Sequence, residues 1–382
     1  MKTADVVVIG AGVVGSSCAL IMAEAGLKVI VVDRGPIAGG TTGAGEGNIM
    51  VSDKEIVPEI ELAVRSRDIW FEIADRIGNN FELHAKGGIA LSRTDAGMAG
   101  LRKLAAHQSA HGIETIEVDG ARLRELEPHM NPDIETAIHY PGDGQCQPML
   151  SAAYFLRTVR HLKGEVWQRT EVLGFSKDKD GAITGVRTAR EEISTRYVVN
   201  ATGTWAGDIA RLAGSELSIM PRRGFILVTT PAPKLIHHKV YDADYVANVA
   251  SDSPELQSSA VVEGTESGTI LIGASRERIG FDSRMNMAAL ERLAKQAISV
   301  FPVLSKLELL RVYHGFRPYS PDHLPVIGED ANVKGLFHCA GHEGAGIGTA
   351  PGSGELLTAM ILGKPTFMDA TPFLPSRFQG VA

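Results

Sequence analysis

The chain has 382 residues, 44% of them hydrophobic and 22% charged, with a formal net charge of −7 and three widely spaced cysteines. Because this length exceeds what one hydrophobic core supports, we expect a soluble globular protein with two closely joined domains. The lack of a polybasic run, a CxxC clip and an apolar run of about 20 residues argues against nucleic acid, a metal or disulfide framework, and a membrane span. The first residues enter a strand without signal-peptide features, so we expect a reducing, cytoplasmic setting.

The first 33 residues predict a strand, a helix and a second strand. The run ADVVVIG suits a strand buried on both faces, AGVVGSSCALIMAEAG has the apolar stripe of a helix, and KVIVVD is a second buried strand. The turn between the first strand and the helix, residues 10–15, reads GAGVVG and matches the G-x-G-x-x-G pattern of dinucleotide-binding units. Asp33 ends the second strand, close to the spacing of about 20 residues at which this pattern places an acidic residue.

Each part of this pattern has a physical purpose. Gly10 permits a tight turn, Gly12 lets the backbone approach a pyrophosphate, and Gly15 lets the helix pack closely on the strand. The helix N-terminus presents free N–H groups and positive partial charge to phosphates. Asp33 can accept hydrogen bonds from a ribose hydroxyl. The sequence therefore predicts a dinucleotide site, although the pattern alone does not choose between FAD and NAD.

The rest of the chain alternates helical and strand-like segments. The stretches with helical apolar spacing are 54–78, 95–111, 150–164 and 285–300. The strand-like stretches are 87–94, 113–119, 165–203, 223–230, 259–275 and 335–341. Residues 259–275 read as a hairpin that turns near 265–268. We expect a nucleotide-type α/β domain interleaved with an antiparallel β domain, with the chain crossing between them more than once.

Four further segments resemble motifs of the D-amino-acid oxidase superfamily. They are GGTTGAGEGNI, YVVNATGTWAGDIARLAG, GFRPYSPDHLPVIGE and AGHEGAGIGTAPGSGELLTAMILG, in chain order. With the N-terminal pattern they extend the resemblance from residue 5 to residue 363. Within the superfamily, the chain most resembles the FAD-carrying β subunits of bacterial multi-subunit dehydrogenases that act on opines (octopine or nopaline), D-hydroxyproline or L-proline.

The resemblance implies an α/β fold in which a Rossmann-like FAD-binding domain is interleaved with an antiparallel β-sheet substrate domain. The implied FAD-binding domain comprises 1–80, 140–215 and 315–382, and the implied substrate domain comprises 81–139 and 216–314. The implied cofactor is FAD, held noncovalently because the loop at 46–48 lacks the histidine that carries a covalent flavin in sarcosine oxidase-like members. An FMN at a subunit interface, as in some relatives, stays open.

The family motifs also imply which residues surround the cofactor. The backbone from Gly344 to Ile347 would face the flavin pyrimidine edge, where negative charge grows on reduction. Val172 would offer backbone to the adenine, and Trp205 would pack beneath the ribityl chain. The full set of expected cofactor contacts is Gly10, Gly12, Val13, Val14, Gly15, Asp33, Arg34, Thr41, Thr42, Gly47, Asn48, Val172, Ala201, Gly203, Trp205, Gly344, Ala345, Gly346 and Ile347.

Flavin amine oxidation moves a hydride from the carbon beside nitrogen to flavin N5 and depends mainly on alignment of that carbon. Arg317 matches the family's carboxylate-binding arginine, whose planar fork suits this alignment. Arg223 and Tyr245 are further substrate candidates, with a solvated charge and simple packing as their alternatives. His342 matches a position beside the flavin ring, with a packed, hydrogen-bonded histidine as its alternative. No metal site is expected.

We therefore expect the catalytic β subunit of an FAD-dependent amine dehydrogenase. It would oxidise the secondary amine of an amino-acid derivative such as an opine to an imine, which water then hydrolyses. Electrons would leave through a larger flavin or iron–sulfur partner subunit, and the complex could associate peripherally with a membrane electron-transfer chain. The alternatives are a D-hydroxyproline or L-proline dehydrogenase subunit, a stand-alone glycine or sarcosine-type oxidase that produces hydrogen peroxide, a noncatalytic FAD-binding scaffold, and an NAD dehydrogenase.

Overall fold

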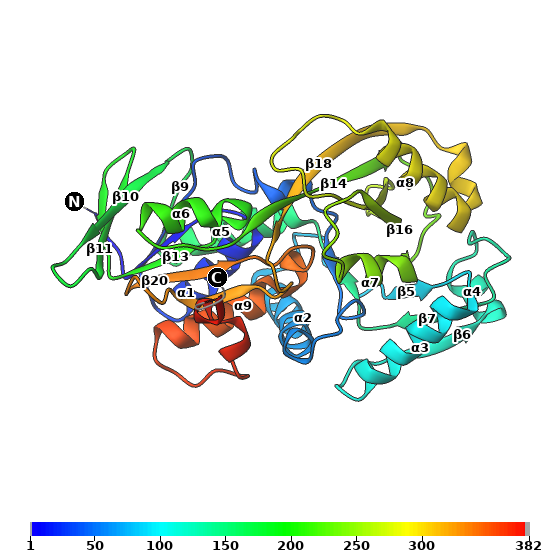
Figure 1. The fold of residues 1–382 in the computed structure, drawn as a ribbon, viewed down its shortest axis with the longest axis horizontal. Coiled ribbons are helices and arrows are strands. Elements are labelled where there is room, and N and C mark those ends of the chain that lie inside the picture. Colours follow the sequence, from blue (N-terminus) through cyan, green and yellow to red (C-terminus); the bar gives the residue numbers. More distant parts are fainter. Residues whose placement is uncertain (1, 379–382) are drawn as a thin grey trace.

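The computed structural model describes residues 2–378 as an elongated molecule with two halves (Figure 1). The described helices are α1 (Val13–Glu24), α2 (Val57–Ile77), α3 (Asp95–Ser109), α4 (Gly120–Leu126), α5 (Pro148–His161), α6 (Ala206–Leu212), α7 (Ala243–Val249), α8 (Met287–Val300) and α9 (Gly346–Ile361). No helix in this described part of the chain combines the length and apolarity needed to cross a bilayer.

The strands form four sheets. The six-stranded sheet has the order β19 (Val326–Glu329), β20 (Leu336–Ala340), β13 (Tyr197–Asn200), β2 (Val6–Ile9), β3 (Val29–Val32) and β9 (Glu165–Trp167). The four-stranded sheet has the order β1 (Lys2–Thr3), β12 (Glu192–Ser194), β11 (Ile183–Thr188) and β10 (Val172–Lys177). The eight-stranded sheet has the order β18 (Leu309–Tyr319), β14 (Met220–Thr229), β17 (Ile270–Arg276), β16 (Gln257–Gly264), β15 (Lys239–Asp242), β5 (Gly88–Leu91), β7 (Thr136–Tyr140) and β6 (Ile116–Asp119). The short pair is β4 (Asn48–Ile49) with β8 (Gly144–Gln145).

The central strand β2 is covered on both faces, which explains its uninterrupted run of valine and isoleucine. It pairs in parallel with β3 and with β13. Val6 and Val8 pack with side chains of the helices α1, α2, α5 and α9, whereas Val7 and Ile9 pack against the four-stranded sheet. Alternate residues of a strand point to opposite faces, so an all-apolar strand requires such a sandwich.

The eight-stranded sheet is likewise covered on two sides. Val240 and Val262 pack with α8, while Tyr241 and Val261 pack with α3 and α7. The predicted hairpin is confirmed, because β16 and β17 pair antiparallel and Thr265 N–H donates to the Thr269 carbonyl across the turn at 2.9 Å. The mixed α/β architecture, with its largely parallel sheet and its separate, largely antiparallel sheet, confirms the predicted fold class.

The chain crosses between the two large sheets more than once. It contributes β5, β6 and β7 to the eight-stranded sheet, returns through β9 and β13 to the six-stranded sheet, and leaves again for β14 to β18. The predicted boundary at residue 315 falls inside β18, whose residues 315–319 remain paired with β14. The domain limits therefore stay a prediction. Because the chain crosses repeatedly between the two large sheets, segments distant in sequence meet where these sheets join.

Candidate active site

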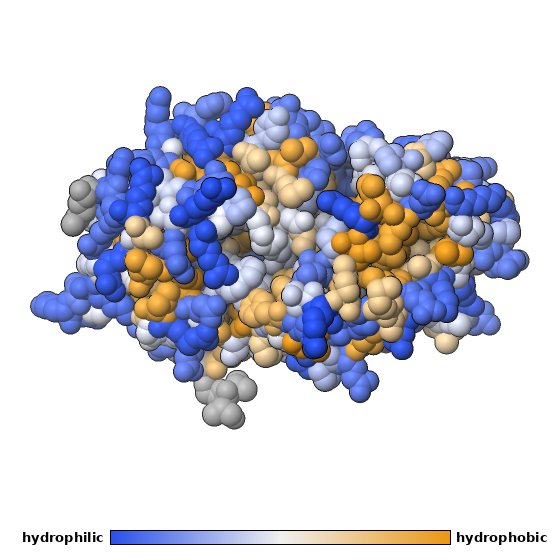
Figure 2. Space-filling view, turned by 90° about the horizontal axis from the view of Figure 1, so that it is seen from above, coloured by the Kyte–Doolittle hydropathy of each residue, from blue (hydrophilic) through white to orange (hydrophobic). Residues whose placement is uncertain are grey.

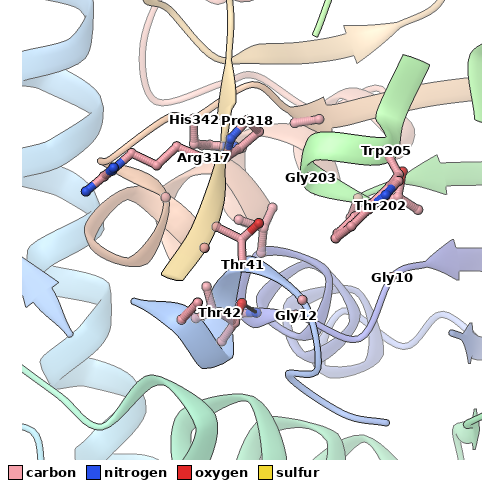
Figure 3. A pocket seen from close by; sticks show the side chains of 18 of the residues that line it. Gly10, Gly12, Thr41, Thr42, Thr202, Gly203, Trp205, Arg317, Pro318 and His342 are labelled. Carbon is pink, nitrogen blue, oxygen red and sulfur yellow. Dashed lines mark hydrogen bonds between the residues drawn. The ribbon is translucent and has the colours of Figure 1, made fainter. Parts of the chain in front are cut away.

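A cavity of about 460 Å³ lies at the junction of the six-stranded and eight-stranded sheets. Its walls are the segments that follow β2, β3 and β13, together with residues of β14, β17 and β18. Figure 3 shows Thr41 and Thr42 between Gly12 and Arg317, with Trp205 on the side opposite the Arg317 guanidinium. A cavity at the carboxyl ends of parallel strands is the usual ligand position in such sheets.

Most residues predicted from the sequence line this cavity. The lining members of the expected cofactor set are Gly10, Gly12, Val13, Val14, Asp33, Arg34, Thr41, Thr42, Asn48, Val172, Ala201, Gly203, Trp205, Gly344, Gly346 and Ile347. The lining members of the expected substrate set are Arg317, His342 and Tyr245. The predicted residues outside the lining are Gly15, Gly47, Ala345 and Arg223.

The turn at residues 10–15 can be built only with glycine at its key positions. Gly10 has a φ of +112°, and a Cβ there would lie 2.4 Å from the Ala201 carbonyl oxygen. A Cβ on Gly15 would lie 2.0 Å from the Gly10 carbonyl oxygen. Gly15 therefore acts away from the cavity, by allowing α1 to pack against the turn that forms the cavity wall.

The N-terminus of α1 faces the cavity with its positive partial charge uncompensated by any acidic residue in the first turn. Gly12 is the N-cap, and a Cβ there would lie 2.9 Å from Thr42 Oγ1. Thr42 Oγ1 in turn accepts from the Val13 N–H at 3.0 Å. The bare backbone at Gly12 and the buried Thr42 hydroxyl thus form one side of an anion-binding surface.

Asp33 joins the two loops that border the same end of the cavity. Its Oδ2 accepts from the Ala11 N–H and its Oδ1 accepts from the Gly35 N–H, each at 2.7 Å. Arg34 places its guanidinium 4.8 Å from the centre of the Trp205 ring. The acidic residue that the sequence pattern predicts is therefore held rigidly by backbone donors.

Arg317 reaches from β18 across β14 to β17. Its Nη1 donates to the Ser275 carbonyl oxygen at 2.8 Å, the one hydrogen bond found for its side chain among the described residues. Burial first, and then the neighbouring charge of Arg276, lower its pKa from the usual arginine value, but arginine remains charged at any physiological pH. The remaining N–H donors make Arg317 a binding group for a carboxylate in the cavity.

His342 lies at the cavity, 3% exposed, with its Nε2 3.0 Å from Ser353 Oγ. Burial lowers its pKa to about 3, so its imidazole is neutral near pH 7. It therefore combines both readings of the sequence: it is packed and hydrogen-bonded, and it also contributes to the cavity wall.

Two acidic residues at the cavity were missed in the sequence. Glu46 Oε2 accepts from Asn48 Nδ2 at 2.8 Å and from Lys239 Nζ at 3.3 Å, while its buried Oε1 has no hydrogen-bond partner among residues 2–378. Glu343 accepts from Arg222 Nη1 at 2.6 Å. Glu46 is the only charged residue within its glycine-rich loop, a signal that could have marked it. Lys239 carried no such local signal.

The structure corrects the prediction that Arg223 contacts substrate. Gly224 and Ile226 line the cavity, and because strand residues alternate, Arg223 points away from it. Arg223 Nε and Nη2 donate to Glu277 Oε1 at 3.0 and 2.7 Å, and Nη1 donates to two backbone carbonyls of residues 282 and 284. The side chain is 4% exposed. Arg223 is therefore a fully paired, buried structural residue.

Gly47 and Ala345 shape the cavity from outside its lining. Gly47 has a φ of +125°, and a Cβ there would lie 2.1 Å from the Cys146 carbonyl oxygen. Ala345 is the N-cap of α9, and its N–H donates to the His342 carbonyl at 2.9 Å. Both residues support the backbone that carries Asn48 and Gly346 to the cavity.

The fold and this cavity define a dinucleotide-binding oxidoreductase with a half-buried arginine, Arg317, in the cavity wall. The chain belongs to the family of FAD dependent oxidoreductases (DAO), whose family model matches residues 5–360. Family membership confirms the resemblance and FAD as the cofactor, and it removes the NAD alternative. The chain is an FAD-dependent, amine-oxidising enzyme that acts on amino-acid or amine substrates.

The relatives cover almost the whole chain at low identity. The hydrogen cyanide synthase subunit HcnC of Pseudomonas aeruginosa is 28% identical, with 99% of this chain and 97% of the relative aligned. The glycine oxidase of Geobacillus kaustophilus is 26% identical, with 98% of this chain and 97% of the relative aligned. The crystal structure of L-proline dehydrogenase from P. horikoshii superposes with a TM-score of 0.89 at 25% identity, covering 99% of this chain and 98% of that structure.

The residues present fit FAD. The side-chain-free backbone at Gly12, the α1 N-terminus and the hydroxyl of Thr42 suit a pyrophosphate, and Asp33 borders the end where a ribose would lie. At the other end, the start of α9 provides backbone N–H groups near Gly346, where a reduced ring system would gain negative charge. We expect a noncovalent complex.

Proposed function

We propose that this chain is the FAD-carrying catalytic subunit of a dehydrogenase that oxidises the secondary amine of an amino-acid derivative, such as an opine. The observation that carries the proposal is Arg317, a half-buried guanidinium at the cavity whose side chain has a single hydrogen bond among residues 2–378, to the Ser275 carbonyl. A carboxylate bound there would hold the neighbouring C–N bond within the cavity. The imine product would then be hydrolysed by water.

The residues around Arg317 have separate tasks in this proposal. Arg317 orients the substrate carboxylate, and neutral His342 adds a wall without a competing charge. The unpartnered Oε1 of Glu46 can accept a hydrogen bond from the amine, since it is a buried acceptor at the same cavity. When bound, FAD supplies the chemistry of hydride acceptance. The protein's contribution is therefore alignment and exclusion of water.

A role as one subunit of an assembly is supported by two observations. One relative is itself described as a subunit, of hydrogen cyanide synthase. Figure 2 shows apolar side chains gathered in patches on one face, and the exposed apolar residues include Phe281, Met285, Met287, Leu309 and Leu310. Apolar patches of this kind mark interaction surfaces. We propose a larger flavin or iron–sulfur subunit as partner and electron acceptor.

The second candidate is a stand-alone glycine or sarcosine-type oxidase, which the glycine oxidase relatives favour. The test is to purify the chain alone and with co-expressed partner subunits, and to record its flavin spectrum anaerobically. Octopine, nopaline, D-hydroxyproline, L-proline, sarcosine and glycine are added in turn. Bleaching by octopine or nopaline supports the proposal, and bleaching by glycine alone replaces it with the second candidate.

Readmitting air separates a dehydrogenase from an oxidase. The expected result is that the flavin of the isolated chain stays reduced in air, with little peroxide released, and is reoxidised quickly only when the partner subunit and an added artificial electron acceptor are present. Rapid release of hydrogen peroxide by the isolated chain would favour the oxidase. A flavin that no amine reduces would contradict both candidates. Release of the flavin by acid precipitation would show that it is noncovalent.

A further inference from the structure

Arg276 is a buried arginine that forms no ion pair with an acidic residue of the described chain. It ends β17 and is 3% exposed. Within residues 2–378 its side chain makes no hydrogen bond and no ion pair; its guanidinium carbon lies 5.1 Å from the centre of the Tyr245 ring. A buried cation without an anion is costly, so it calls for a ligand.

Arg276 is not itself among the residues that line the cavity, but it borders two residues that are. Ala274 lines the cavity, and Arg276 lies two residues further along β17, on the same face of the sheet. Tyr245, beneath its guanidinium, also lines the cavity. Arg317 donates to the carbonyl of Ser275, the residue between Ala274 and Arg276. Two guanidinium groups therefore lie near the cavity on β18 and β17, the two strands that flank β14.

Neither arginine has a carboxylate within ion-pair distance among the described residues, although the charge of Glu343 acts on both of them. The cavity-lining Glu343 is paired with Arg222 at 2.6 Å and with His323 Nδ1 at 3.2 Å. Although burial opposes ionisation, His323 and the charges of Arg276 and Arg222 hold the pKa of Glu343 at about 2. Glu46 is paired with Lys239 at 3.3 Å. The ion pairs of the described chain include neither Arg276 nor Arg317.

Other buried arginines of the eight-stranded sheet show what a structural role looks like. Arg222 is fully buried and bonds to Glu343, to Gln257 and to backbone carbonyls. Arg223 is paired with Glu277 and with two carbonyls. Arg276 has no comparable set of acceptors. A role in folding alone therefore does not account for its charge.

We propose that Arg276 binds a second carboxylate of the substrate, so that the site takes iminodicarboxylates, in which carboxylates flank a secondary amine on both sides. This rests on the proposed function, because it assigns Arg317 to the first carboxylate of the same molecule. The amine then lies between two fixed anchors. Glycine, sarcosine and proline offer only one carboxylate and leave Arg276 unpaired.

The test uses ligands that cannot be oxidised as amines. Diglycolate carries two carboxylates about an ether oxygen, and ethoxyacetate is its counterpart with one carboxylate replaced by methyl. Dissociation constants of both are measured for the holoenzyme by flavin absorbance changes and by calorimetry. Hydrogen bonds between charged groups predict that diglycolate binds roughly 10- to 100-fold more tightly than ethoxyacetate.

Variants test whether Arg276 causes the preference for diglycolate over ethoxyacetate. Arg276→Met should remove the preference for diglycolate while changing the affinity for ethoxyacetate less than about twofold, and Arg276→Lys should retain part of it. Arg311→Met is the matched control, because Arg311 is an exposed arginine of β18 that also lies over a tyrosine ring, that of Tyr313. The control should leave both affinities unchanged.

Stability separates this role from a structural one. In the ligand-free holoenzyme Arg276→Met should keep its FAD and melt at the wild-type temperature or above, since it removes an unpaired buried charge. A lower melting temperature would show that the charge supports the fold and would contradict the proposal.

Three binding results would overturn the inference: no preference for diglycolate in the wild type, equal losses of both ligands in Arg276→Met, or a preference that survives in Arg276→Met. Because neither ligand is an amine, these results do not depend on turnover.

If diglycolate binds through Arg276 but no amine reduces the flavin, the proposed function fails and the subsite stands. If secondary amines reduce the flavin without regard to a second carboxylate, the proposed function stands and the subsite fails.

Discussion

Gly224 of β14 lies directly beneath the guanidinium of Arg317 in β18. A Cβ added at Gly224 would be 2.0 Å from Arg317 Nη1 and 2.5 Å from the Ser275 carbonyl oxygen. The absence of a side chain at Gly224 therefore lets Arg317 cross one strand of the sheet and bond to the next. The position of the proposed carboxylate anchor depends on a glycine 93 positions earlier in the chain.

This relationship predicts that Gly224→Ala weakens substrate binding without loss of FAD. The new methyl group must displace Arg317, and misplacing an aligning group by about 1 Å can lower the rate roughly 100-fold. Anaerobic flavin reduction measures the loss in kcat/KM, and the flavin absorbance per chain measures retention of the cofactor. Gly100→Ala on α3 is the control, because a Cβ there meets nothing within 4 Å. Normal kcat/KM in Gly224→Ala would contradict the assignment.

Replacing Arg317 itself tests the anchor directly. Arg317→Met should lose most substrate binding and keep FAD, because its contacts are to the cavity and to Ser275 rather than to the residues around the α1 N-terminus. Arg317→Lys should recover only part of the affinity, since a lysine lacks the planar fork. Saturation curves for flavin reduction distinguish the variants. Wild-type affinity in Arg317→Met would remove Arg317 as the anchor.

His342 predicts an acid-dependent loss of stability. Burial lowers its pKa from 6.5 to about 3, so the unfolded chain binds a proton in this interval while the folded chain does not. Unfolding is then favoured as the pH falls from about 6.5 to 3, by up to about 1.4 kcal/mol per pH unit for this group. Above about pH 6.5 the histidine is neutral in both states and contributes no slope.

Denaturant unfolding of the holoenzyme at several pH values measures this slope. His342→Asn should reduce it between pH 6.5 and pH 5, whereas replacing the exposed His161 in the same way should not. The rate of flavin reduction should depend on pH in the same way in the wild type and in His342→Asn. An unchanged stability slope in that variant would mean that His342 titrates as it does in water.

The corrected role of Arg223 predicts a loss of stability rather than of substrate recognition. Arg223→Met leaves Glu277 charged and buried, which should lower the free energy of unfolding by about 3 to 5 kcal/mol. Adding Glu277→Leu should restore much of this loss, because the unpaired carboxylate is then gone. Substrate dissociation constants should remain at the wild-type value in both variants. A selective loss of substrate binding in Arg223→Met would revive the original prediction.

The N-terminal dinucleotide unit could be predicted from the sequence because its determinants are local. The glycines at positions 10, 12 and 15 are required by backbone conformation and close approach within one turn, and the valine run of β2 requires burial on both faces. The segment that opens α9 was recognisable for the same reason. Its glycines bring backbone rather than side chains to the cavity.

The tertiary structure alone decided which charged residues meet in the substrate end of the site. Arg222 and Arg223 are adjacent in sequence, but the register of β14 turns one toward Glu343 and the other toward Glu277. Arg276 had no local signal, because its importance comes from Tyr245 beneath it and from the absence of an ion pair to it among the described residues. Local sequence determines the conformation of a turn or a strand. The pairing of buried charges depends on the long-range register of strands, which no short motif encodes.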